Sequence, residues 1–306
     1  MPSMNISKSI VINAPADQVF RVIGNFNSWT KWSPWLIAEP DAKVDVSSDG
    51  EEYSWEGKVT GAGNMKITKS VEGESVEIDL HFIKPWKSQA DVAFLLEKDG
   101  GGTKVTWTMK SGIPFFLFWM KKMMEVMVGM DYDRGLKMLK DFVEDGEVHS
   151  KLEFIGNEQF DGGKYIGIKT KCTMTEIGEQ MQGDFIKINE YIEGKDFVIG
   201  HPFSIYHKWA FVKGNVEYTS GVLVSSVPDD LPNYFVIGEI PSTPVHTIRH
   251  TGPYEHLGNA WSTQMMYERG KVFKQNKKIH PFEVYVSDPA QTAPNDLVTE
   301  IHLPMK

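Results

Sequence analysis

The chain has 306 residues, a formal net charge of −9 and a single cysteine, Cys172. One cysteine excludes an intramolecular disulfide and a zinc site built from several cysteines, and the acidic balance argues against a nucleic-acid partner, which would require a basic surface. The length suits two domains better than one, and 41% hydrophobic residues can supply a core for each.

No signal peptide is evident, because the first residues lack a basic segment followed by an apolar core. The longest apolar run, IPFFLFWM at 113–120, is far shorter than the roughly 20 residues that span a bilayer. We therefore expect a cytoplasmic protein without stable membrane insertion. The run could touch a membrane surface, with Lys121 and Lys122 at the headgroups, but we expect it to form the buried start of a helix.

The first half begins with residues 4–12, in which apolar side chains recur at even positions and predict a half-buried strand. Pro15 suits the first turn of a short helix that ends at Gly24. Between residues 50 and 110, short alternating segments separated by turn signals predict at least five antiparallel strands. Apolar residues at three- and four-residue steps predict a long helix over 114–145.

These elements describe a curved antiparallel sheet that grips a long C-terminal helix. SIVINAPADQVFRVIGNFNSWTKWSPW (9–35) and MDYDRGLKMLKDFVE (130–144) resemble segments of the polyketide cyclase/START-like superfamily, which has the helix-grip fold. We place this domain at 1–147. The resemblance implies a hydrophobic cavity but no particular chemistry, since these domains take very different ligands. Six tryptophans suggest that the cavity is rich in aromatic side chains: Trp29, Trp32, Trp35, Trp55, Trp86 and Trp107.

The second half, 150–306, contains an internal repeat. PFSIY at 202–206 returns as PFEVY at 281–285, 79 residues later. The pentapeptides belong to a larger repeat, strand–helix–strand–strand, in which Lys169 corresponds to Arg249 at an offset of 80. Two units cannot build an extended array, so the repeat predicts a duplicated, pseudo-twofold domain. The complete chain is thus expected to be of the α+β class.

RHTGPYEHLGNAW (249–261) and PFEVYVSDPAQTAPNDLVTEIHLP (281–304) resemble the GyrI-like domain, also found as the effector-binding module of AraC-type regulators. The resemblance implies a groove between the two repeats, lined by aromatic residues, with an acid near its floor. Glu283 falls at the position of that acid, and the first repeat has Ser204 there. An acid in only one of the two repeats is consistent with a single, asymmetric pocket in a pseudo-symmetric domain.

Several aromatic residues could wall this groove or simply pack in the core. Tyr254 and Trp261 are seven residues apart on a predicted helix, so we expect them on one face, offering π-faces to flat or cationic ligands. Glu300 also matches a recurring acid of the family and could be structural. The candidate ligand-binding residues are Glu283, Tyr254, Trp261, Tyr285, Tyr206 and Trp209.

The leading expectation is a protein that binds hydrophobic small molecules, which could be cationic or aromatic, through the groove with its single acid. The helix-grip domain could supply a second cavity. Two alternatives remain open, and in the first the chain modulates a protein partner. It could also hydrolyse strained electrophiles such as epoxide or cyclopropyl toxins, as the resemblance implies for some members. Glu283 would then activate water as a general base, with Tyr254 or Tyr285 as proton donor.

We expect no cofactor and no metal. His246 and His250 are four residues apart in a predicted strand, where this spacing spans about 13 Å, too far to hold one ion. No helix-turn-helix is evident, so the DNA-binding unit that often accompanies this effector module is missing from the pattern. The oligomeric state is not predicted.

Overall fold

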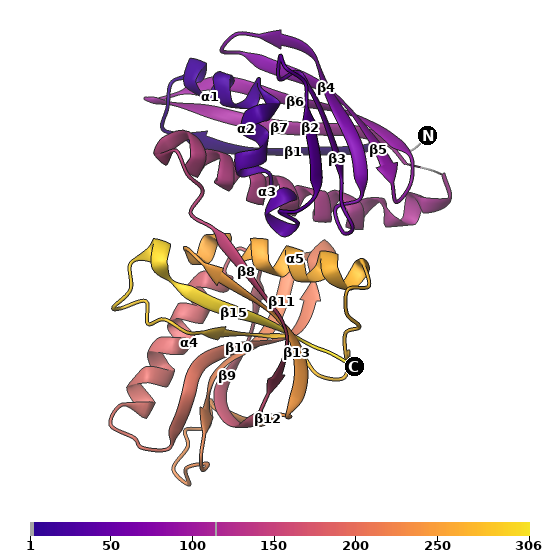
Figure 1. Ribbon diagram of the computed structural model, residues 1–306. Coiled ribbons are helices and arrows are strands. Elements are labelled where there is room, and N and C mark those ends of the chain that lie inside the picture. The colour runs from indigo at the N-terminus through magenta and orange to yellow at the C-terminus, as the bar shows by residue number, and fades with distance from the viewer. Residues whose placement is uncertain (1–2, 114) are drawn as a thin grey trace. The chain divides into compact units, whose positions relative to one another are not determined.

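The computed structural model describes residues 3–113 and 115–306, which belong to two compact units, 1–151 and 152–306 (Figure 1). Both are α+β, as expected, and each contains one antiparallel sheet flanked by helices. In the part of the chain that the structure describes, no helix has the length and apolar character needed to cross a membrane.

Unit 1 is a seven-stranded antiparallel sheet in the order β1-β7-β6-β5-β4-β3-β2. Its strands are β1 (Ser3–Ile12), β2 (Lys43–Val46), β3 (Glu52–Glu56), β4 (Ala62–Val71), β5 (Ser75–Lys84), β6 (Ser88–Asp99) and β7 (Gly102–Gly112). Its helices are α1 (Ala16–Ile23), α2 (Phe26–Trp32), η1 (Leu36–Ala38), η2 (Phe115–Met120) and α3 (Lys121–Asp145). The long α3 runs along the sheet (Figure 1), which confirms the predicted helix-grip architecture.

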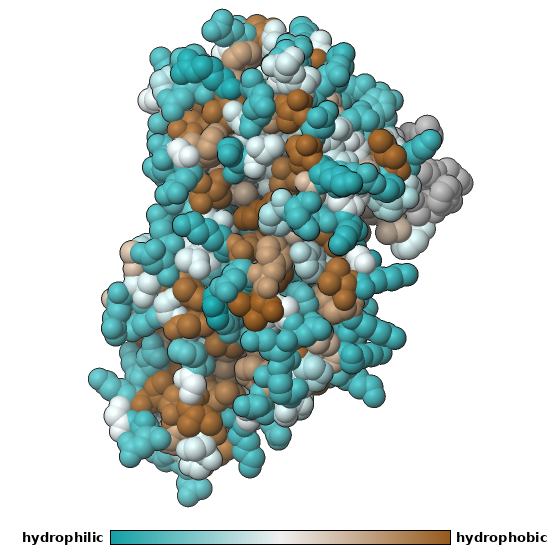
Figure 2. Space-filling view, viewed as in Figure 1, coloured by the Kyte–Doolittle hydropathy of each residue, from teal (hydrophilic) through white to brown (hydrophobic). Residues whose placement is uncertain are grey.

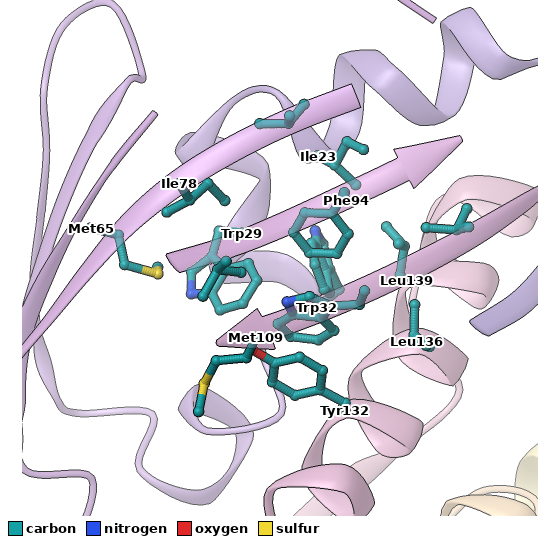
Figure 3. Close-up of a cluster of buried hydrophobic side chains, with 14 of the residues drawn as sticks. Ile23, Trp29, Trp32, Met65, Ile78, Phe94, Met109, Tyr132, Leu136 and Leu139 are labelled. Atoms are coloured by element: carbon teal, nitrogen blue, oxygen red, sulfur yellow. The ribbon is translucent and has the colours of Figure 1, made fainter. Parts of the chain in front are cut away.

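The hydrophobic core of unit 1 has aromatic side chains at its centre and aliphatic side chains and methionines around them (Figure 3). At its centre the Trp107 ring stacks on Tyr132 at 3.9 Å and on Phe94 at 4.9 Å, while Trp29 and Trp32 approach it from α2. The tryptophans at 29, 32, 35, 55 and 107 all belong to this core. Trp86 does not, because it lies in the turn between β5 and β6 with 53% of its surface exposed, so its expected place in the interior is wrong.

The apolar run at 113–120 also departs from expectation. Residue 114 lies outside the described residues, but Phe118 and Trp119 in η2 are 58% and 70% exposed. The prediction that this run is the buried start of the helix is therefore wrong for these two side chains. The face of the molecule drawn in Figure 2 likewise mixes hydrophilic and hydrophobic side chains, as protein surfaces normally do.

Unit 2 is an eight-stranded sheet in the order β12-β9-β11-β10-β14-β15-β13-β8. Its strands are β8 (Lys151–Phe160), β9 (Gly163–Thr173), β10 (Val198–Ala210), β11 (Asn215–Val224), β12 (Val236–Ile240), β13 (Thr243–Thr251), β14 (Phe282–Tyr285) and β15 (Val298–Pro304). Its helices are α4 (Ile177–Ile192) and α5 (Gly258–Arg269), with the short turns η3 (Phe211–Lys213), η4 (Tyr254–His256) and η5 (Pro294–Asp296).

The predicted repeat is present as β9–α4–β10–β11 and again as β13–α5–β14–β15. Each copy also has a leading strand that the repeat pattern did not predict. These strands are exchanged, because β8 of the first copy lies beside β13 of the second, and β12 of the second lies beside β9 of the first. The exchanged strands form the two outer edges of the sheet.

The two copies meet at the centre of this sheet, where β10 pairs antiparallel with β14. The paired residues are Phe203 with Val284, Ser204 with Glu283, and Ile205 with Phe282. The repeated pentapeptides therefore lie directly against each other, and the pseudo-twofold axis passes between their middle residues, Ser204 and Glu283.

Candidate functional site

Glu283 is a buried carboxylate at the centre of unit 2, with 2% of its surface exposed. Its Oε1 accepts hydrogen bonds from the hydroxyls of Tyr206 at 2.7 Å and Tyr285 at 2.5 Å. Its Oε2 accepts one from the indole Nε1 of Trp261 at 2.9 Å. The structure thus brings together four of the residues singled out from the sequence.

The repeat explains this convergence. Alternate residues of a strand share a face, so Glu283 and Tyr285 project from the same side of β14. Tyr206 holds the place in β10 that Tyr285 holds in β14, and the antiparallel pairing brings both hydroxyls to the axis. Trp261 reaches the same point from α5. One carboxylate on the axis is therefore held by a tyrosine from each repeat.

Burial raises the pKa of Glu283, and the hydrogen bonds from Tyr285, Tyr206 and Trp261 offset this only in part. Burial and the nearby carboxylate also hold the pKa values of Tyr206 and Tyr285 well above their usual value, so both hydroxyls keep their protons. Within the described ranges no Lys, Arg or His forms an ion pair with Glu283. A buried carboxylate without a cation is costly, and a cationic ligand could supply the missing charge.

Aromatic rings surround the carboxylate. Tyr206 stacks on Trp209 at 4.6 Å and packs nearly perpendicular to Trp261 at 5.0 Å, both distances between ring centroids. The indole Nε1 of Trp209 is buried and has no acceptor in the described part of the chain. Trp209 and Trp261 are each partly exposed, whereas Tyr206 is buried. We call Glu283, Tyr206, Tyr285, Trp261, Trp209 and Ser204 the Glu283 cluster.

Tyr254 has a different position from the one expected. It lies in η4, which precedes α5, so it does not share a helix face with Trp261. Its ring still packs against Tyr285, with centroids 5.7 Å apart, and 40% of its surface is exposed. Burial of part of the side chain, with the charges of Glu283 and Asp288, raises its pKa. Tyr254 is thus at the border of the cluster and forms no hydrogen bond with Glu283.

A second buried acid, Asp184 on α4, was not recognised in the sequence. It is 6% exposed, and its Oδ2 accepts hydrogen bonds from Thr170 at 2.8 Å and Tyr218 at 3.1 Å. Burial raises its pKa despite these bonds. The offset of 80 that relates the two helices pairs Asp184 with Gln264, and this difference between copies was the available signal.

Two further residues of α4 contact the cluster and were also missed. Met181 Sδ lies 3.4 Å from the hydroxyl of Tyr285, and the ring of Phe185 meets the edge of the Tyr285 ring at 5.3 Å. Met181 is the offset-80 counterpart of Trp261. Both helices therefore present a side chain to the same carboxylate–tyrosine centre.

Glu300 has another role. It pairs with Val284 across β14 and β15, so it faces away from the side of the sheet that carries Glu283. Its carboxylate forms an ion pair with Arg249 at 2.7 Å. Hydrogen bonding to His302, together with Arg249, lowers its pKa to about 2 against the opposing effect of burial. Over residues 3–113 and 115–306, no group of three or more His, Cys, Asp or Glu side chains could hold a metal ion.

The fold and the buried centre define a protein of two small-molecule-binding folds, and the sequence comparisons specify both. Residues 3–144 match the family described as polyketide cyclase / dehydrase and lipid transport. Residues 158–306 match the GyrI-like small molecule binding domain. The chain therefore combines a polyketide cyclase-type domain with a GyrI-like domain. Among curated proteins, none matches this sequence.

Solved structures show more distant likeness. An EcmrR–DNA complex is 14% identical, with 61% of this chain and 69% of that chain covered and a TM-score of 0.43. The structure of SAV2435 bound to tetraphenylphosphonium is 14% identical, with coverages of 50% and 94% and a TM-score of 0.41. Protein CV1439 from Chromobacterium violaceum is 17% identical, with coverages of 46% and 98% and a TM-score of 0.36.

Proposed function

We propose that unit 2 binds small hydrophobic cations at the Glu283 cluster. One observation carries this proposal. Glu283 is buried and held by three neutral hydrogen-bond donors, yet has no cationic partner within the described residues. Such a carboxylate ionises at a cost that a bound cation would offset.

The aromatic side chains support the same ligand class. Trp209, Tyr206 and Trp261 pack around the acid. Trp209 is itself stacked on Tyr206 at 4.6 Å and on Phe211 at 5.5 Å, and a desolvated cation that reaches an aromatic face gains about 2 kcal/mol or more. A strongly hydrated metal ion or a small polar ammonium would gain less from these apolar walls. The expected ligand is therefore a cation whose charge is carried by an apolar body.

Calorimetric titration with methyltriphenylphosphonium tests the proposal, with triphenylphosphine oxide as a neutral molecule of similar shape. We expect the cation to bind and the oxide to bind at least about tenfold more weakly, a difference of about 1.4 kcal/mol. Glu283→Gln removes the charge but keeps the shape and should abolish this preference. Glu239→Gln removes an exposed carboxylate of β12 and should leave it intact. Equal affinity of Glu283→Gln and the parent protein for the cation would overturn the proposal.

A second candidate function uses the raised pKa of Glu283. Glu283 would take a proton from a water molecule whose oxygen attacks an epoxide carbon. The carbon–oxygen bond of the ring would break, and Tyr254 or Tyr285 would donate a proton to the released oxygen. The product is then a diol. Mass spectrometry of styrene oxide incubated with the protein tests this. Enzymatic diol that falls about 10²–10⁴-fold in Glu283→Gln would support hydrolysis, and diol at the uncatalysed rate would exclude it for this probe.

A further inference from the structure

The second buried acid, Asp184, has an unused oxygen. Both of its hydrogen bonds, from Thr170 and Tyr218, end on Oδ2. Oδ1 has no hydrogen-bond donor from the residues that the structure describes. The charge of Lys187 acts to lower the pKa of Asp184, but no Lys, Arg or His among these described residues forms an ion pair with it. Oδ1 is not one of the fully buried side-chain atoms that lack a partner, so it stays within reach of solvent or of a bound ligand.

The other repeat shows what a purely structural residue looks like at this place. Gln264 of α5 is the counterpart of Asp184 and is completely buried. Its Nε2 donates to the backbone oxygens of His246 at 2.8 Å and Ile301 at 2.9 Å, and its Oε1 lies 2.8 Å from His246 Nδ1. A neutral amide thus ties the helix to the two strands below it with every polar atom engaged. Asp184 is a carboxylic acid, although the example of Gln264 shows that a neutral side chain is enough to hold the helix on the sheet.

Two tyrosines connect Asp184 to the Glu283 cluster. Tyr218, which donates to Asp184, is the register partner of Tyr206, which donates to Glu283, and their ring centroids are 6.4 Å apart. Tyr218, Tyr206 and Glu283 lie on the neighbouring strands β11, β10 and β14. Asp184 projects from α4, so its distance from Glu283 follows from the two tyrosines. Their ring centroids are 6.4 Å apart and each hydroxyl lies 3.1 Å or less from its carboxylate, which places the two carboxylates on the order of 10 Å apart.

We propose that Asp184 and Glu283 are the two ends of one site that takes an elongated dication, with its cationic groups on the order of 10 Å apart and an apolar body between them. This rests on the proposed cation binding at Glu283 and names the ligand class of that site more closely. Each repeat contributes one acid, at a position where the other repeat has a neutral residue, Ser204 or Gln264. The proposed site thus has one carboxylate at each end, and the two carboxylates come from different positions in their repeats.

The test compares α,ω-bis(trimethylammonium)alkanes of increasing chain length with alkyltrimethylammonium ions of the same lengths. Calorimetry on the full chain should show an affinity maximum at one intermediate dication length and no such maximum for the monocations. Asp184→Asn should weaken the best dication on the order of 30-fold, which corresponds to about 2 kcal/mol for loss of one buried charge partner. The same variant should leave monocation affinity within about threefold. Glu283→Gln should weaken both ligand series.

The outcomes separate the two proposals. If monocations bind and depend on Glu283, but dications bind no more tightly than they do, the cation site stands and the two-ended site is overturned. If Asp184→Asn weakens both series equally, Asp184 acts through the fold, and the inference is again overturned. Thr170→Val, which removes one hydrogen bond to Oδ2 but no charge, controls for such an effect and should preserve the chain-length optimum. If neither series binds, the proposed function itself fails.

Discussion

Ser204 and Glu283 are register partners across the central strands β10 and β14, at the point where the two repeats of unit 2 meet. Residues opposite each other in an antiparallel pair have Cβ atoms about 4.5–5.5 Å apart. Identical acids at this pair would place two carboxylates in one buried space. A single acid there can instead receive a hydroxyl from each copy, Tyr206 from the first and Tyr285 from the second. The two equivalent tyrosines can both donate to one carboxylate because only one of the two repeats carries the acid.

Restoring the symmetry should therefore destabilise the protein. Ser204→Glu places a second carboxylate against Glu283. Either one of the two stays protonated, or their repulsion lowers the free energy of unfolding. We expect a loss of at least about 2 kcal/mol in the free energy of unfolding at pH 8 compared with Ser204→Gln, which has the same size without the charge. Urea denaturation followed by circular dichroism measures both, and the difference should shrink at pH 5. Equal stability of the two variants at pH 8 would show that the site is more open than its burial indicates.

Glu283 should also set a pH dependence of stability with a definite sign. Its folded pKa is raised from 4.5, so between the unfolded and the folded pKa the native state holds more protons than the unfolded state. Stability should then fall as the pH rises through this window. Glu283→Gln removes the titration, so its stability relative to the parent should increase from pH 4 to pH 8. A relative stability that is flat, or that decreases, would contradict the raised pKa. Cation binding should follow the opposite course and tighten as pH rises, because it requires the ionised form.

The two tyrosines that hold Glu283 should both contribute to the stability of unit 2. Tyr206→Phe and Tyr285→Phe each remove one donor to Oε1 and should cost about 1–3 kcal/mol of unfolding free energy. Tyr285→Phe should cost more, since its hydroxyl also lies 3.0 Å from Ser204 Oγ. Tyr165→Phe is the matched control, a buried tyrosine of β9 whose hydroxyl makes no hydrogen bond with the described residues. If the control were as destabilised as the other two, ring packing would account for the losses and the hydrogen bonds would not.

Much of the fold could be predicted from the sequence because its signals are periodic. Alternation defines the long strands of unit 1, and the pentapeptide repeat defines the central pair of unit 2. The strands that escaped prediction are β2, β8 and β12, which are edge strands of the two sheets. Edge position alone is not the reason, because β1 is also an edge strand and alternates cleanly. Instead, β2 and β12 have only four and five residues, and β8 is interrupted by Gly156, whose φ is 85°. The exchange of β8 and β12 between the copies is also invisible in a local pattern, because it depends on which sheet edge is free.

The candidate site was predictable to the extent that it follows from strand alternation. Glu283 and Tyr285 of β14 and Tyr206 of β10 lie on one face of the sheet, next to the pseudo-twofold axis, so their convergence follows from alternation and the repeat. Tyr254 could not be placed, since the helix begins four residues after it and a 3-10 turn redirects the side chain. Asp184 required a comparison of the two helices residue by residue. Its burial comes from the packing of α4 on β9 and β11, which the amino-acid pattern of the helix does not specify.

Unit 1 offers an independent test at Glu39, a carboxylate only 6% exposed after η1. It accepts hydrogen bonds from the backbone N–H groups of Lys58 at 2.6 Å, Val59 at 3.1 Å and Thr60 at 2.9 Å, and from the Thr60 hydroxyl at 2.8 Å. Burial acts to raise the pKa of Glu39, but these bonds outweigh it and hold the pKa below its usual value. The loop between β3 and β4 is thus folded around one negative charge.

Glu39→Gln should cost about 2–3 kcal/mol in the free energy of unfolding of unit 1 at pH 7, because the amide has one acceptor oxygen and turns an N–H group toward donors. The folded pKa is lowered, so this contribution is complete above the unfolded value near 4.5 and is lost as the pH falls. The unfolding free energies of the parent and the variant should therefore converge in acid.

Gly57→Ala should cause a similar loss of stability, since its Cβ would lie 2.2 Å from Glu39 Oε2. Tryptophan fluorescence reports the transition, because only Trp209 and Trp261 of the nine tryptophans belong to unit 2. Glu72→Gln, at an exposed acid of the same unit, should change nothing, and a Glu39→Gln variant equally stable at pH 7 would refute the role of the charge.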